Sequence, residues 1–401
     1  PFPLSVNSSV VIADRAISFN DVKARLGGAT IRGSLAFDGQ TPSRVSGALD
    51  ADTIEAPPLI ASAIGLPAAA GSNGGAAWVW SSEPFGGGLF GAFNGEIALK
   101  ARQVVLLPRL VAREFRANVR FDKGGFAVDD ATGDISGGHL AGALSFRAAE
   151  DGLKVRAKIS LTGVDAAGLL PSAARPPVTG SLAVSADVEG SGLSPVALVG
   201  SLQGNGKIAL SDGQLAGLDP RAFDAVTRAV DQGLPIDDAR ISDAVGKALD
   251  SGQLAVEHAD GTLAVSAGQV RLNNATVGGK DAALSLAGIL DLTDGSLDAR
   301  LVLSGSGQAG GARPDIFMAL KGPLAAPKRS IDVSALTGWL TLRAVENQAR
   351  QIRDMENAQR RAQPPAPKPK SELAPVLPAP LEVARPPGPR RSPAVSVGSQ
   401  N

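Results

Sequence analysis

The sequence contains no cysteine and no tyrosine, and only two histidines occur in its 401 residues. Disulfide bonds, thiol catalysis and Cys/His metal sites are therefore excluded or poorly supported. The 39 basic residues balance the 39 acidic ones, so the chain lacks the positive charge that marks nucleic-acid-binding proteins. The sequence has no run of about 18 apolar residues, so it predicts no transmembrane helix. We expect no metal, no cofactor and no nucleic-acid partner.

What the sequence does contain is glycine, with 48 residues, and stretches in which apolar and polar residues alternate strictly. In "LKVRAKISL", Leu153, Val155 and Ile159 point to one side while Lys154 and Arg156 point to the other. "FRANVRF" and "SLAVSADVE" repeat the pattern, and Asp-Gly or Asn-Gly pairs typical of tight hairpins follow many such stretches. The pattern predicts β-strands with one apolar and one polar face.

The number of these stretches, on the order of twenty, predicts one very large sheet. Because twisted open sheets of more than about ten strands curl, split or close, we expect a mostly β fold. The expected form is a long, curled, largely antiparallel sheet that makes an elongated apolar groove, with a few inserted helices and a C-terminal capping helix. The expected regions are the sheet over 1–331 with helical inserts near 56–66 and 219–252, an amphipathic helix over 332–361, and a disordered Pro-rich tail over 362–401.

The apolar face allows two interpretations. In a sandwich it would be a closed core, but aromatic residues make up only 4% of the chain and many positions on this face are Ala or Gly. An open face would instead form a trough for acyl chains, where each buried methylene contributes about 0.8 kcal/mol without specific contacts. The candidate groove residues are Phe115, Val119, Phe121, Leu153, Val155, Ile159, Leu182, Val184, Val188, Leu263, Val265, Leu284, Leu286, Leu297, Leu301 and Leu303.

Catalytic motifs are weak. The strings "GGGLFG" from Gly86 and "GSGQAG" from Gly305 match GxGxxG, but neither opens a helix that could hold a pyrophosphate. His139 and His258 stand alone on predicted strands, which indicates solvent-facing histidines rather than ligands or bases. We therefore expect no enzymatic activity.

The end of the ordered region differs from the strands before it. In "KGPLAAPKRSIDVSALTGWLTLRAVENQ", prolines and the charges of Lys328 and Arg329 protect a last edge strand, and a helix follows. The helix is expected to cap the sheet. In a second interpretation, Trp339 and nearby arginines meet a membrane interface or a partner protein.

Three stretches carry a family resemblance: "RAISFNDVKARLGGATIRGSLAFDG", "LQGNGKIALSDGQLAGLD" with the helices after it, and "ALKGPLAAPKRSIDVSALTGWLTLRAVENQ". Together they resemble the C-terminal region of AsmA-family envelope proteins of Gram-negative bacteria. The resemblance implies a periplasmic β-groove, attached to the inner membrane through an N-terminal segment absent from this chain. It also implies a lipid-binding conduit or assembly factor for phospholipid transport and outer-membrane biogenesis.

The implied partners are a phospholipid or another acyl lipid, together with outer-membrane or periplasmic assembly proteins. Two alternatives remain at this point: a non-transporting scaffold of the cell envelope, whose sheet interior would be sealed by side chains, and an adhesin-like secreted β-protein. Fixed-period repeats, which the adhesin would need, do not appear in the sequence.

Overall fold

The computed structural model describes residues 4–13, 16–26, 29–39, 43–66, 80–88, 91, 93–107, 110–169, 176–279, 282–305 and 314–362. Apart from its first residue, the expected Pro-rich tail lies outside this range, as does the string that follows Gly305. The chain divides into a unit over Pro1–Asn347 and a second unit over Gln348–Asn401.

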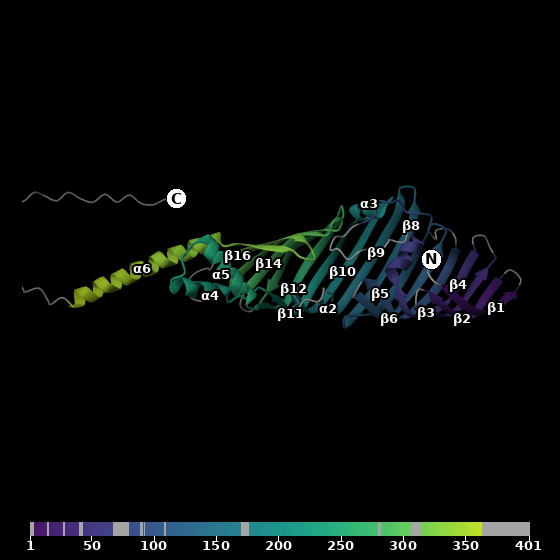
Figure 1. Cartoon of the computed structure of the whole chain (residues 1–401), viewed down its shortest axis with the longest axis horizontal. Helices are drawn as coiled ribbons and strands as arrows, with labels where there is room; N and C mark the ends of the chain where they lie inside the picture. Colours follow the sequence, from purple (N-terminus) through teal and green to yellow (C-terminus); the bar gives the residue numbers. More distant parts are fainter. Residues whose placement is uncertain are drawn as a thin grey trace, which may run out of the picture. The chain divides into compact units, whose positions relative to one another are not determined.

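One sheet dominates the first unit, and its strands follow one another in sequence order (Figure 1). The described residues form seventeen strands. Their bounds are β1 (Leu4–Ala13), β2 (Ala16–Leu26), β3 (Ala29–Asp38), β4 (Ser43–Glu55), β5 (Phe93–Leu107), β6 (Leu110–Asp122), β7 (Gly125–Ile135), β8 (Gly138–Ala149), β9 (Gly152–Asp165), β10 (Val178–Gly192), β11 (Gln203–Ala216), β12 (Gln253–Ser266), β13 (Gln269–Gly278), β14 (Ala282–Asp291), β15 (Ser296–Gly305), β16 (Ile316–Pro323) and β17 (Lys328–Asp332).

Each strand pairs with the next, from β1–β2 to β16–β17, and the pairs are antiparallel apart from β4 and β5. Consecutive hairpins explain the antiparallel pairs. Between β4 and β5 the chain instead passes through helix α1 (Ala56–Ala63) and a long connection, which allows the parallel pair. The predictions of a mostly β fold, a large and mostly antiparallel sheet, inserted helices and a C-terminal helix are confirmed.

The described helices are short inserts, except for the last. They are α1 (Ala56–Ala63), α2 (Ala166–Leu169), α3 (Pro195–Gly200), α4 (Ala222–Asp231), α5 (Asp238–Asp250) and α6 (Ser334–Ala362). Helices α2 and α3 are not among the predicted elements. Ser194 followed by Pro195 is nevertheless a typical helix start, and the Ser194 side chain accepts a hydrogen bond from the Ala197 N–H.

The residues before α4 have the sequence of a helix start but do not form one. Asp219 and Pro220 look like N-cap and first helical residue, but α4 begins at Ala222 after Arg221. Asp219 is instead buried, with 5% of its side chain exposed, and its carboxylate accepts hydrogen bonds from the N–H and guanidinium of Arg221. The residue therefore fixes the turn between β11 and α4 rather than capping the helix.

On several strands, β-bulges keep the apolar side chains on one face. Asp21 and Asp130 have φ angles of 52° and 51°, in the left-handed region that Asp tolerates. At Asp21 the register with β3 shifts between Phe19 and Val22, so these two residues lie on the same face although they are three apart. Without the extra residue, the apolar pattern after the bulge would point to the opposite face.

Candidate lipid-binding face

The strand register places the candidate groove residues on one face of the sheet. Directly paired residues point to the same side, and residues two apart on a strand share a face. Leu161 pairs with Val184, Val184 with Ile208, and Ile208 with Gly261, which makes a transverse row across four strands. We call the side that carries this row the apolar face, and the opposite side, which carries Ser185, the polar face.

Strand pairing places the other candidate groove residues on the same apolar face. Phe121 pairs with Phe126, Phe126 with Phe146, and Phe146 with Val155. Farther along the sheet, Leu284 pairs with Leu303. All the candidates therefore lie on the apolar face, although sixteen separate pairing steps connect the first strand to the last.

Burial divides these candidates into two groups. The buried ones are Phe115, Leu153, Val155, Val265, Leu284, Leu301 and Leu303. The partly exposed ones are Val119, Phe121, Leu182, Val184, Val188, Leu263, Leu286 and Leu297, and Ile159 is 43% exposed. The apolar face is therefore a closed core in some places and accessible to solvent in others.

The C-terminal part of the face is covered by helices. Phe223 of α4, Ile241 and Val245 of α5, and Leu336 and Leu340 of α6 are all buried in one cluster. This cluster also contains strand residues Leu254, Leu284, Leu303, Ile316 and Met318. Figure 1 shows α4 and α5 beside β16, at the end of the sheet where the late strands lie. Here the helices form a cap over the sheet.

A second cover lies over the middle strands. Ile64, next to α1, packs with Phe126, Phe146, Leu153 and Val155. The Phe126 and Phe146 rings are stacked with centroids 4.9 Å apart, a contact that adds stabilisation beyond the area buried. Val155 and Leu153 are therefore core residues, and the expectation that they line an open trough is wrong at these two positions because α1 and its flanking residues cover them.

Between the two covers, the row of Leu161, Val184 and Ile208 remains partly exposed. The hollow of about 520 Å³ that these residues border is on the other side of the sheet, because most of its lining residues, such as Ser185, Lys207 and Thr262, lie on the polar face. A Cβ atom on Gly261 would lie 2.6 Å from Leu272 Cδ1 and 3.1 Å from Ile208 Cγ2, so the absence of a side chain makes room for these neighbours. Leu161, Ile208 and Gly261 are not among the predicted groove residues, although Ile208 lies in the same alternating pattern as Val184.

The N-terminal strands carry the most exposed part of the apolar face. Val6, Val10 and Ile12 of β1 are 56%, 51% and 74% exposed. Ile12 pairs with Ile17, and Val10 with Phe19, so the apolar face continues to this edge. These residues are not among the predicted groove residues, although Val10 and Ile12 show the same period-two alternation.

Trp339 lies against the C-terminal cluster rather than free at an interface. Its ring packs on the cluster, half-buried, and the Arg343 guanidinium carbon is 5.7 Å from the ring centroid. Arg343 also forms an ion pair with Asp231 at the end of α4, at 3.2 Å. These contacts support the capping interpretation for the first turns of α6, while Leu342 and Val345 on the same helix are exposed.

The histidines lie on the surface, each beside a carboxylate. His139 Nδ1 is 3.4 Å from Asp134, and His258 Nε2 is 2.7 Å from Asp260. Within the described ranges, no three His, Asp or Glu side chains gather in a way that could hold a metal ion. The helices that the structure describes include none that is both long and apolar enough to cross a membrane.

Fold and face together define a protein class: a β-protein in which one very large sheet presents an apolar face that helices cover only in part. The family model described as "AsmA family" matches residues 68–275, a little over half of the chain. The chain therefore belongs to the AsmA family, which is consistent with a role in the cell envelope and in outer-membrane biogenesis. No curated protein and no solved structure matches it significantly.

Proposed function

We propose that this protein binds the acyl chains of phospholipids on the uncovered part of the apolar face and thereby supports phospholipid transport and outer-membrane biogenesis. The observation that carries the proposal is the transverse row of Leu161, Val184 and Ile208, which stays partly exposed while both flanking regions of the same face are covered. Monomeric soluble proteins rarely leave large contiguous apolar areas open unless something binds there.

The expected binding is strong but unspecific. Each methylene removed from water contributes about 0.8 kcal/mol, so a chain of about ten buried methylenes gains about 8 kcal/mol before entropic costs. Such an interaction needs no catalytic group and no cofactor, and we propose a non-enzymatic role. Leu, Val and Ile side chains with small neighbours such as Gly261 are sufficient lining for acyl chains.

The family supports the proposed location and partners. Because AsmA proteins are envelope-associated, we propose that the sheet works in the periplasm, attached to the inner membrane through an N-terminal segment. Outer-membrane or periplasmic assembly proteins are the proposed protein partners. The alternative is a structural scaffold of the envelope, which the fully buried Leu284 and Leu303 favour, since a sealed face could not hold lipid.

The experiment is purification of the full chain under native conditions, followed by lipid extraction and mass spectrometry. Val184→Asp and Ile208→Asp place a charge in the open row, where side chains keep access to water. Ser185→Asp is the matched control, because Ser185 follows Val184 and points to the polar face. We expect phospholipid with the wild type and the control, and its loss from both row variants while the thermal unfolding midpoint stays within a few degrees.

Two results would contradict the proposal. The first is a wild-type protein that carries no lipid and gains none from added vesicles. The second is equal lipid content in all variants, which would place the lipid elsewhere. If Val184→Asp unfolds the chain, the open row is core and the scaffold is the better explanation.

A further inference from the structure

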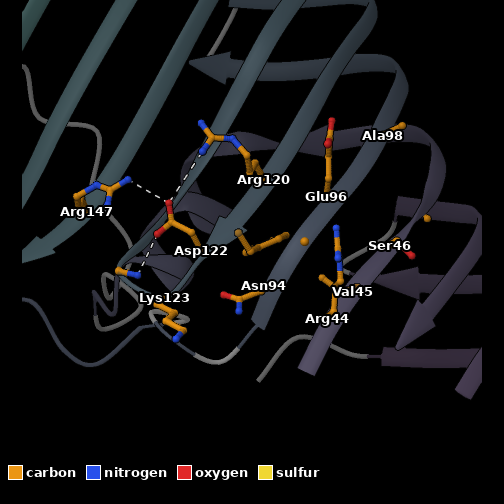
Figure 2. A pocket seen from close by; sticks show the side chains of 14 residues that line it. Arg44, Val45, Ser46, Asn94, Glu96, Ala98, Arg120, Asp122, Lys123 and Arg147 are labelled. Atoms are coloured by element: carbon orange, nitrogen blue, oxygen red, sulfur yellow. Dashed lines mark hydrogen bonds and ion pairs between the residues drawn. The ribbon is translucent and has the colours of Figure 1, made fainter. Parts of the chain in front are cut away.

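A second hollow lies on the polar face, away from the acyl-binding row. It measures about 1060 Å³ and lies where β4, β5, β6 and β8 present charged side chains (Figure 2). Its charged lining residues are Arg44, Glu96, Arg120, Asp122, Lys123 and Arg147. Four of these are cations and two are carboxylates, although the chain as a whole has no net charge.

The register explains why residues so far apart in sequence meet here. Arg44 pairs with Asn94 in the parallel β4–β5 ladder, and Glu96 pairs with Arg120 in the next ladder. Asp122 pairs with Gly125, which pairs with Arg147. These side chains therefore share one face of the sheet, and no local sequence motif could have indicated the cluster.

Some of the cations are already engaged. Arg120 and Arg147 are directed toward Asp122 (Figure 2). The distance to Asp122 Oδ2 is 4.0 Å from Arg120 Nη1 and 3.0 Å from Arg147 Nη2. Arg120 also donates a hydrogen bond to Asp129 at 2.9 Å, and this bond raises the pKa of Arg120 above its usual value. These pairs hold the guanidinium groups in place, while each arginine keeps further N–H donors for another anion.

Other groups of the lining have no such partner. The exposed side chains of Arg44 and Lys123 form no ion pair with any described residue. Asn94 Oδ1 is buried without a hydrogen-bond donor in the described part of the chain. Glu96 also lines the hollow, opposite Arg120 in the ladder, and forms no ion pair within 4.0 Å with a described residue. The site thus offers cations for an anion and, beside them, two groups that can accept hydrogen bonds, the Glu96 carboxylate and the Asn94 side-chain carbonyl.

We propose that this hollow binds a phosphate ester that also carries an ammonium group, as in phosphoethanolamine. Lys and Arg recognise the phosphate oxygens through charge-assisted hydrogen bonds. The ammonium group donates hydrogen bonds to Glu96 and to Asn94 Oδ1, which otherwise remains a buried acceptor without a donor. This proposal does not rest on lipid binding by the apolar face, because the hollow lies on the polar face.

The test is binding of soluble O-phosphoethanolamine to the full chain, measured by isothermal titration calorimetry at low salt. The double variant Arg44→Gln/Lys123→Gln removes the two unpaired cations, and Arg300→Gln on distant β15 is the control that removes an exposed charge from the same face. Loss of charged hydrogen bonds predicts at least about tenfold weaker binding in the double variant and no change in the control. Folding should be unaffected, since no ion pair is lost.

Phosphocholine serves as a second probe because its quaternary ammonium has no N–H donor. We expect it to bind more weakly than O-phosphoethanolamine, and Glu96→Gln to reduce this difference. Flotation with phosphatidylethanolamine/phosphatidylcholine vesicles, compared with vesicles of phosphatidylcholine alone, shows whether the bound group is a lipid headgroup or a free phosphate ester. Binding to both the soluble probe and the mixed vesicles indicates a lipid headgroup, and binding to the soluble probe alone indicates a free phosphate ester.

The proposal is overturned if O-phosphoethanolamine does not bind at millimolar concentration. It is also overturned if the double variant and the control bind it equally, or if phosphocholine binds as tightly as O-phosphoethanolamine. Lipid on the apolar face is read out separately by the Val184→Asp variant, so failure of either proposal leaves the other standing.

Discussion

The substitution Ile241→Ala tests whether the α4–α5 pair is a fixed cap or a mobile lid. Ile241 is completely buried in α5, one turn before Val245, in the cluster that contains Leu284 and Leu303 of the sheet. Removing most of a fully buried Ile side chain costs about 2–5 kcal/mol, while Ile241→Val should cost about 0.5–1.5 kcal/mol. For a fixed cap we expect this graded loss in the free energy of unfolding.

Urea unfolding gives the stability change, and hydrogen exchange locates it. If the cap is part of the sheet, the amides of α5 and β15 in the wild type should share similar protection, and Ile241→Ala should lower both together. Arg240→Ala on the exposed side of the same helix is the control, since its ion pair with Asp237 is a surface pair worth at most about 1 kcal/mol.

The fixed-cap interpretation fails if Ile241→Ala costs less than about 1 kcal/mol while α5 exchanges much faster than β15 in the wild type. That outcome would mean that α4 and α5 open independently and that the apolar face extends farther than the static structure suggests.

Three further predictions concern the same region. Gly252→Ala should destabilise the protein by about 1–3 kcal/mol, measured by thermal unfolding, because its Cβ would lie 2.2 Å from Asp219 Oδ2, an atom that Arg221 and neighbouring groups hold in place. Leu303→Asp should prevent folding or lower the unfolding midpoint strongly, whereas Ser304→Asp on the polar face should not, as circular dichroism can show. Burial alone would raise the pKa of Asp219, but its hydrogen bonds from Arg221 outweigh this effect and lower the pKa. The stabilising contribution of this carboxylate should therefore be present above about pH 4 and be lost as the pH falls further. In Asp219→Asn, the free energy of unfolding should depend less on pH below about pH 4. If stability falls at low pH equally in Asp219→Asn and the wild type, other carboxylates cause that loss of stability.

The sequence was sufficient to predict the apolar face because the strand signal is local. Lys154 and Arg156 between Leu153 and Val155 indicate a two-sided strand without knowledge of the neighbours. The bulges, however, follow from tertiary pairing. Nothing in "FNDVKA" shows that Phe19 and Val22 share a face until the register with β3 places Asp21 at positive φ.

Coverage of the face could not be predicted from strand patterns at all. Val155 and Val184 have the same alternating surroundings, yet Val155 is 9% exposed beneath the residues around α1 while Val184 remains partly open. The difference arises from which inserted helix folds back over which strands, a long-range property. The charged hollow has the same origin, since Arg44 and Arg147 meet only through the ladders between them.

Cover by helices differs along the apolar face. Where helices cover the face, large side chains such as Phe223, Leu284 and Ile316 fill the space. Between the covers, Gly206 and Gly261 lie in the same transverse rows as larger residues. A Cβ atom would lie 2.4 Å from Ser185 O at Gly206 and 2.6 Å from Leu272 Cδ1 at Gly261, so neighbouring atoms already occupy the space beside both glycines. What distinguishes this part of the face is that Leu161, Val184 and Ile208 stay partly exposed. A purely structural sheet would gain stability by covering them, so their exposure favours lipid binding over a purely structural role.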